Sequence, residues 1–192
     1  MVKGKFEDPS FKADTTSLFN SMQEGSNGGQ VQNYKNAAVS PGIKWFRPTD
    51  IHKNVSLWGS DGISVKVSEQ GFDGDCWFLS SASALAAYPE RIKAMFPGQD
   101  KYSDIGAFQV RLYVRGEPVN VIVDDRMPVY DYSFAAGYSV NYPWLNDSQS
   151  KAGAYWLTIL EKAMAKLNVN YTGINGGEVA QAMRYMTGMP TM

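Results

Sequence analysis

Three stretches of the sequence carry the apolar spacing of helices. The most regular runs from Gly153 to Leu167, where apolar residues recur at spacings of three and four with charged residues between them. That pattern predicts an amphipathic helix with one buried face. A second helix is predicted from Cys76 to Tyr88, and Pro89 is expected to stop it. A shorter helix is predicted from about Glu178 to Met186, after a pair of glycines.

Two other stretches alternate apolar and polar residues, as half-buried strands do. The first covers residues 107–114, and the second is the β-branched run 119–123, after a turn that includes Arg115 and Gly116. Two such runs separated by a short turn predict an antiparallel hairpin. Ordered structure is expected to begin at Ile43–Pro48. Helices packed with a small hairpin indicate an α+β fold.

The first forty residues have a different pattern. They are polar and, between Ser21 and Gln30, rich in glycine, so they offer few side chains to bury. We therefore expect a flexible polar tail over residues 1–40 and one folded domain over residues 41–192. Within the tail, a short helix is expected near Thr16–Met22, with Asp14 or Thr15 as its cap.

Composition limits the partners and the setting. Hydrophobic residues make up 44% of the chain and the formal net charge is −1, which allows a core but gives no electrostatic reason to bind nucleic acid. No apolar run approaches the length of about 20 residues that spans a bilayer, so no membrane span is expected. One cysteine and one histidine are too few for an internal disulfide or a structural zinc site. A reducing, cytoplasmic setting is expected.

The single cysteine, Cys76, follows a loop that contains Gly71 and Gly74 and begins an apolar helical run. The thiol is therefore expected in the first turn of a helix, where free N–H groups and the helix dipole favour a thiolate. Gln70, across the loop, is a candidate to donate its side-chain amide to an oxyanion, with the Cys76 N–H as second donor. A lone cysteine is more often a small buried apolar residue, and a glutamine in such a place is more often solvated. Position alone leaves both interpretations open.

The segment Gln-Gly-x-x-Gly-Asp-Cys-Trp at residues 70–77 closely resembles the calpain family of intracellular cysteine proteases. Three further stretches resemble calpain segments in the same order: Trp45–Ile51, Val121–Pro128 and Tyr155–Leu167, followed by the pairs Gly176-Gly177 and Thr187-Gly188. The resemblance runs from about Trp45 to Gly188. It implies the first subdomain of a papain-like calpain protease core, with helices packed around a central Cys-bearing helix and a small antiparallel hairpin.

The resemblance also implies an activity and a site. The family hydrolyses peptide bonds in protein substrates through a cysteine thiolate and an acyl-enzyme, so Cys76 would be the nucleophile and Gln70 the oxyanion donor. The segment Asp124–Arg126 is expected to be an ion-paired strand end. Asp75 is expected to cap or orient the Cys76 helix, without a chemical role.

The chain lacks an evident base for such a reaction. In thiol proteases a histidine takes the thiol proton and a third group orients the imidazole; in calpains the second subdomain supplies the His and Asn. The only histidine, His52, lies upstream of Cys76 and is expected to be an ordinary surface or hydrogen-bonded residue. We therefore expect the nucleophile half of an endopeptidase, inactive alone. The alternative is a non-catalytic calpain-like regulatory or partner-binding module.

Calcium enters through the resemblance alone. Calpain-like enzymes typically bind a calcium ion in each subdomain, held in the first by one carboxylate before the Gln and another after the Gly-Gly loop. In this sequence Val67 and Gln181 stand at those places, with Glu69 or Glu178 as substitutes. Because hard cations need several oxygen ligands, preferably charged, the residues themselves do not support a calcium site, and no metal ligand is assigned.

Overall fold

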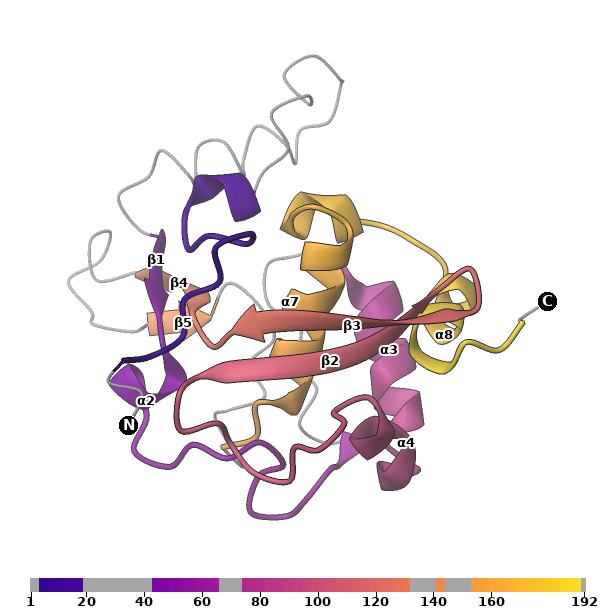
Figure 1. Ribbon diagram of the computed structural model, residues 1–192, viewed down its shortest axis with the longest axis horizontal. Coiled ribbons are helices and arrows are strands. Elements are labelled where there is room, and N and C mark those ends of the chain that lie inside the picture. Colours follow the sequence, from indigo (N-terminus) through magenta and orange to yellow (C-terminus); the bar gives the residue numbers. More distant parts are fainter. Residues whose placement is uncertain (1–3, 19–42, 66–73, 132–140, 144–152, 191–192) are drawn as a thin grey trace.

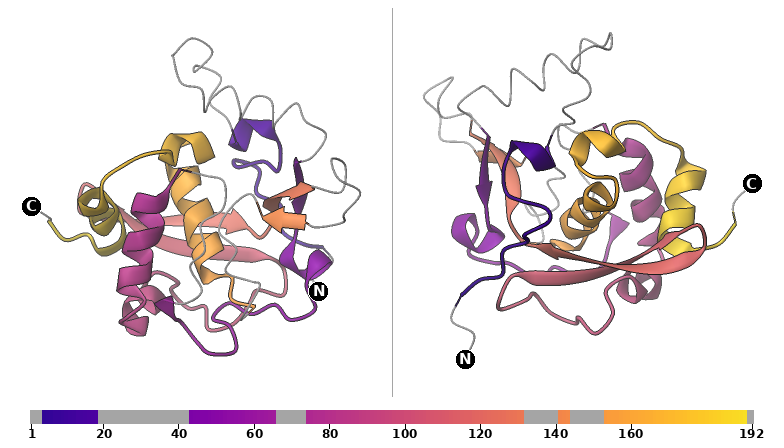
Figure 2. Two further views of the ribbon diagram at one scale, coloured as in Figure 1. Left: turned by 180° about the vertical axis from the view of Figure 1, so that it is seen from behind. Right: turned by 45° about the horizontal axis from the view of Figure 1, so that its top comes forward.

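The computed structural model describes residues 4–18, 43–65, 74–131, 141–143 and 153–190 (Figure 1). Its main elements are three helices and a two-stranded hairpin: α3 (Cys76–Leu85), α7 (Trp156–Leu167), α8 (Val179–Thr187), β2 (Ala107–Val114) and β3 (Glu117–Asp124). Figure 2 shows the three helices on the same side of the hairpin. The predicted α+β fold is confirmed.

Shorter elements complete the described part of the chain: the 3₁₀ helices η1 (Thr15–Ser17) and η4 (Tyr171–Ile174), the helices α2 (Pro48–Ile51) and α4 (Pro89–Ala94), and the strands β1 (Ile43–Phe46), β4 (Met127–Asp131) and β5 (Asn141–Pro143). Strands β1, β4 and β5 form a small antiparallel sheet in that order. Within the described residues, no helix combines the length and the apolar character needed to cross a membrane.

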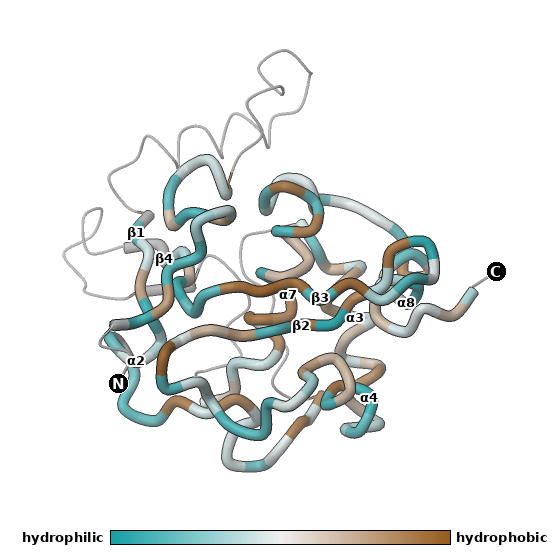
Figure 3. Tube along the Cα trace, in the orientation of Figure 1, coloured by the Kyte–Doolittle hydropathy of each residue, from teal (hydrophilic) through white to brown (hydrophobic). Residues whose placement is uncertain are grey.

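The hairpin has the predicted strands. Ala107 is opposite Asp124 and Val114 is opposite Glu117. Between the strands, Arg115 and Gly116 have φ angles of 53° and 85°, which is the left-handed geometry that a two-residue hairpin turn requires. Alternate residues of β2 are buried toward the helices, and the hydrophobic colour of Figure 3 runs along the hairpin beside α7.

The helices differ from their predicted bounds at the ends. Helix α7 begins at Trp156 rather than Gly153, because Gly153 has a φ of 62° and cannot continue a right-handed helix. Helix α3 ends at Leu85 rather than Tyr88. Pro89 does not simply end it but is the first residue of α4, a position that suits the fixed φ of proline. Helix α8 matches its prediction to within one residue at each end.

Residues 4–18 pack against the domain, although their polar composition placed them in the predicted tail. The side chains of Phe11 and Leu18 are only 2% and 1% exposed. Asp8 is also buried and accepts a hydrogen bond of 2.6 Å from Lys166 of α7. Asp14 caps η1, which is the described part of the helix predicted near residues 16–22. Residues 19–42 lie outside the described residues, so the boundary at residue 40 stays a prediction.

The strand end at Asp124–Arg126 is ion-paired, as predicted. Asp124 is buried and contacts Lys162 of α7 at 2.6 Å and Arg126 at 2.7 Å. Burial alone would raise the pKa of Asp124, but the neighbouring cations Lys162 and Arg126 outweigh it and hold this pKa below its usual value. Buried Asp125 pairs in turn with Arg47, next to α2. These pairs connect β3, α7 and the segment around β1.

Candidate active site

Cys76 is the first residue of α3 and its side chain is exposed. The carbonyl of Asp75 accepts the N–H groups of Phe78 and Leu79, at 2.8 and 3.1 Å. In the described part of the chain, the N–H groups of Cys76 and Trp77 have no protein acceptor. Free N–H groups at the positive end of a helix stabilise an anion. The thiol therefore has the helix-terminal position that the sequence predicted, and it is not sealed in the core.

The loop before α8 holds the residues on both sides of Cys76. The Trp77 side chain is buried, and its Nε1 donates to the carbonyl of Ile174 at 2.8 Å. The N–H of Gly176 donates to the carbonyl of Gly74 at 2.9 Å. A Cβ atom at Gly177 would come within 2.5 Å of Cε2 of the Trp77 ring, so glycine is needed for this close approach. The two glycines thus hold the segment around Cys76 in different ways: Gly176 by its hydrogen bond to Gly74, and Gly177 by its packing against the Trp77 ring.

The sequence analysis also assigned roles to Gln70 and His52, and the structure describes only the second of them. Gln70 lies among residues 66–73, outside the described residues, so its role as oxyanion donor stays a prediction. His52 is exposed directly after α2, and its ring lies 6.4 Å from the ring of Tyr155. This agrees with the expectation of an ordinary surface histidine.

Directly before Cys76 lies an acid, Asp75, whose burial the sequence analysis did not foresee. Asp75 occupies the N-cap position of α3, as predicted, but it caps the helix through its backbone carbonyl, because its side chain makes no capping hydrogen bond. Both carboxylate oxygens are buried. Burial raises the pKa of Asp75 to about 6, although the neighbouring Glu161 of α7, also fully buried, acts in the opposite direction. Two carboxyl groups therefore lie between α3 and α7.

The raised pKa of Asp75 predicts how stability depends on pH. Below about pH 4 this group is protonated in both the folded and the unfolded chain and changes nothing. Between about pH 4 and 6 the unfolded chain has lost the proton that the folded chain still holds, so rising pH favours unfolding. Because the folded chain keeps this proton up to about pH 6, ionisation of the buried Asp75 should lower the free energy of unfolding by up to about 3 kcal/mol at neutral pH.

The substitution Asp75→Asn should remove this pH dependence. Urea unfolding of both proteins between about pH 4 and 7 should show the variant gaining stability over the parent chain by roughly 2–3 kcal/mol across that range. Asp104→Asn is the control, because that side chain is 86% exposed and its substitution should show no such trend. A stability difference for Asp75→Asn that stays constant with pH would contradict a buried acid of raised pKa.

The described residues do not fit a calcium site. None of their His, Cys, Asp and Glu side chains form a group of three or more that could hold a metal ion. Glu178, at the N-cap of α8, and Gln181, within that helix, are exposed, while Val67 and Glu69 lie outside the described residues. No chemical step is therefore assigned to a metal ion.

Sequence comparison identifies relatives for nearly the whole chain. The model of the calpain family of cysteine proteases matches residues 6–192. Calpain-14 of Homo sapiens is 30% identical over 189 residues, which is 97% of this chain and 24% of that protein. Calpain-5 of Mus musculus is 32% identical over 95% of this chain and 26% of its own length. The catalytic subunit of calpain-1 of Bos taurus is 30% identical over 80% of this chain and 20% of its own length.

The chain thus spans about a quarter or less of the length of these relatives. The family match begins at residue 6 rather than near Trp45, where the resemblance in the sequence motifs begins. This earlier start agrees with the packing of residues 4–18 against α7. Because one continuous match takes in this segment, the hairpin and the helices that hold Cys76 and Trp77, the chain belongs to the calpain family of cysteine proteases.

Proposed function

We propose that this chain supplies the nucleophile half of a calpain-type endopeptidase, in which Cys76 attacks peptide bonds of protein substrates. The observation that carries the proposal is the exposed thiol at the start of α3, beside N–H groups that have no protein acceptor in the described residues. The thiolate would add to the peptide carbonyl carbon, and loss of the amine would leave a thioester. Water would then hydrolyse the thioester and regenerate the thiol.

The oxyanion formed in each addition step needs hydrogen-bond donors. The Cys76 N–H at the start of α3 is one proposed donor, and the side-chain amide of Gln70 is the other. Removing one such donor typically costs on the order of 100-fold or more in rate. The loop that contacts Gly74 and Trp77 supports this role, because it limits movement on both sides of the reacting sulfur.

A second subdomain is part of the proposal, because the 192 residues contain one histidine, His52, and we do not assign it as the base. His52 is exposed, and its ring lies beside the ring of Tyr155. The His that takes the thiol proton and the Asn that orients it would come from that subdomain. We also propose a reducing, cytoplasmic setting, in which a lone cysteine stays reduced.

Labelling with a thiol-directed epoxide tests this function. In the chain joined to its second subdomain, mass spectrometry should find one adduct, on Cys76, and Cys76→Ser should give none. The chain alone should react more slowly, by about 100-fold or more, because it lacks the general base. Equal labelling rates for the chain alone and the joined protein would contradict an active site formed by both subdomains. If the joined protein were not labelled, Cys76 would not be the nucleophile.

The absence of a second histidine favours one other candidate, a non-catalytic calpain-like module that regulates or binds a partner. Such a module has no chemical need for an exposed thiol at a helix start. It predicts that the joined protein reacts with the epoxide no faster than a small free thiol does. The coding sequence after Met192 separates the two candidates as well, because an enzyme requires the His and Asn there.

A further inference from the structure

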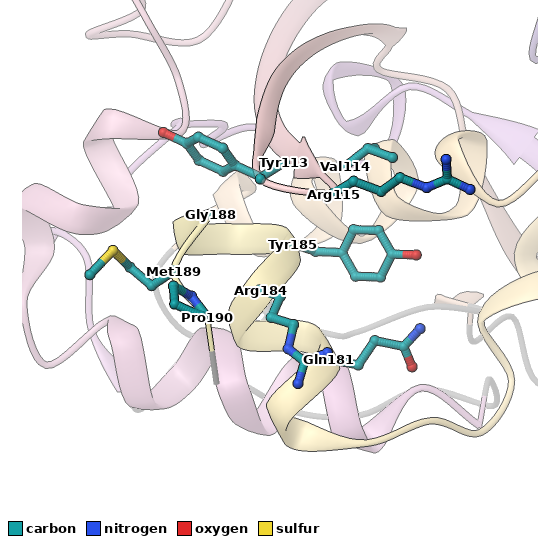
Figure 4. Close-up of a pocket in the computed structure, with 10 residues that line it drawn as sticks. Tyr113, Val114, Arg115, Gln181, Arg184, Tyr185, Gly188, Met189 and Pro190 are labelled. Atoms are coloured by element: carbon teal, nitrogen blue, oxygen red, sulfur yellow. The ribbon is translucent and has the colours of Figure 1, made fainter. Parts of the chain in front are cut away.

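Two adjoining grooves lie at the ends of α3 and α8 that are opposite to Cys76. The first has a volume of about 600 Å³ and lies between the turn of the β2–β3 hairpin and α8 (Figure 4). The second, of about 630 Å³, lies between the last turn of α3, helix α4 and the end of α8. Tyr113 and Met189 line both grooves, which makes them one continuous surface.

The charge of this surface has one sign. Arg115 and Arg184 line the first groove and Arg91 lines the second, whereas none of the described residues that line either groove is acidic. The whole chain has a net charge of only −1, so the surface is a local positive region on a nearly neutral protein. Such a region attracts a partner of negative charge and orients it on approach.

The fold holds these cations in place. Arg115 occupies the first position of the hairpin turn, with a φ of 53°. The turn therefore fixes the backbone position from which its side chain extends at the edge of the first groove. In Figure 4 the Arg115 and Tyr185 side chains extend in the same direction, with Arg184 and Gln181 below them on α8. The guanidinium of Arg91 lies 5.0 Å from the centre of the Tyr88 ring. The arginines are therefore spaced along the grooves rather than gathered at one point.

The rest of the lining is apolar and adaptable. Met183, Met186 and Met189 line the second groove, and the side chains of Met189 and Tyr88 are 65% and 55% exposed. Methionine side chains adjust to the shape of an apolar partner, and exposed apolar patches with a polar rim mark interaction surfaces. An apolar floor with a basic rim fits a peptide that carries both acidic and apolar side chains better than it fits a nucleic acid backbone.

We propose that the two grooves together bind an acidic peptide segment of a partner protein. Its carboxylates would face Arg91 and Arg115, and an apolar side chain would enter the methionine-lined groove. The proposal concerns binding alone and does not require Cys76 to react.

Fluorescence anisotropy with a fluorescein-labelled peptide of alternating glutamate and leucine tests the proposal. The 192-residue chain should bind it, and binding should weaken as salt is raised. Arg115→Glu and Arg91→Glu should each weaken binding by about tenfold, because each replaces an attraction by a repulsion. Lys93→Glu is the matched control: it makes the same change of charge on the exposed face of α4, outside both grooves, and should change affinity by less than about twofold.

All three substitutions are at exposed positions, so circular dichroism melts should show unchanged folding. Failure of the glutamate–leucine peptide to bind the folded chain would overturn the proposal. Equal losses in Lys93→Glu and Arg115→Glu would overturn it too, because the attraction would then be general. So would equal affinity for a lysine–leucine peptide, or tighter binding of a single-stranded oligonucleotide.

Discussion

Replacing Cys76 with alanine should lower kcat/KM by about 10⁴-fold or more in the chain joined to its second subdomain. The reason is that the nucleophile, its base and the oxyanion donors act as a unit, so loss of the atom that forms the covalent intermediate removes the whole route. Cys76→Ser should be nearly as inactive, because a hydroxyl group ionises far less readily than a thiol. Initial rates with a fluorogenic peptide substrate measure both variants.

Ser80→Ala is the matched control for this prediction. Ser80 lies one turn further along α3, its side chain is exposed, and its hydroxyl donates to the carbonyl of Trp77 at 3.3 Å. Its removal should leave kcat/KM within about twofold of the parent value, since surface changes of this kind have small effects. If Cys76→Ala kept most of the activity, or if Ser80→Ala lost as much, Cys76 would not be the nucleophile.

The sequence predicted the elements whose signal is local. The period of helix α7 and the alternation of β2 and β3 repeat over several turns or pleats, and both were found within a few residues of their predicted bounds. The start of α3 at Cys76 was predictable as well, because a glycine-containing loop gives way abruptly to an apolar run. Pro89 was harder, since proline both ends one helix and begins the next.

Contacts between distant segments could not be predicted in this way. Aspartate is a common N-cap residue, so the sequence could suggest that Asp75 begins a helix. That its side chain lies beside Glu161 depends on the packing of α3 against α7. Residues 4–18 are polar in sequence, which predicted solvent exposure. The Asp8 carboxylate instead accepts a hydrogen bond from Lys166 within the fold. The glycines at 176–177 were recognisable as part of a family pattern, but the close approach of Gly177 to the Trp77 ring depends on the tertiary structure.

Lys162→Met should lower the free energy of unfolding by about 3–5 kcal/mol at neutral pH. The Lys162 side chain is fully buried, and its Nζ donates to Oδ1 of Asp124 at 2.6 Å and to the carbonyl of Arg126 at 2.5 Å. Burial lowers the pKa of Lys162 to about 8 although Asp124 acts against this, so the lysine is still charged at neutral pH. Methionine fills similar space but leaves the buried carboxylate of Asp124 with Arg126 as its remaining cation.

The cost should fall in acid, because protonation of Asp124 removes the charge that has lost its partner. For the same reason, adding Asp124→Asn to Lys162→Met should recover part of the loss in a double-mutant cycle of urea unfolding. Lys101→Met provides the exposed control: its ion pair with Asp104 is 82% and 86% exposed, and its loss should cost at most about 1 kcal/mol. A Lys162→Met cost no larger than this control would mean that the Asp124 carboxylate does not need its lysine, and that other contacts, such as the hydrogen bond from Lys166 to the carbonyl of Ile122, attach α7 to β3.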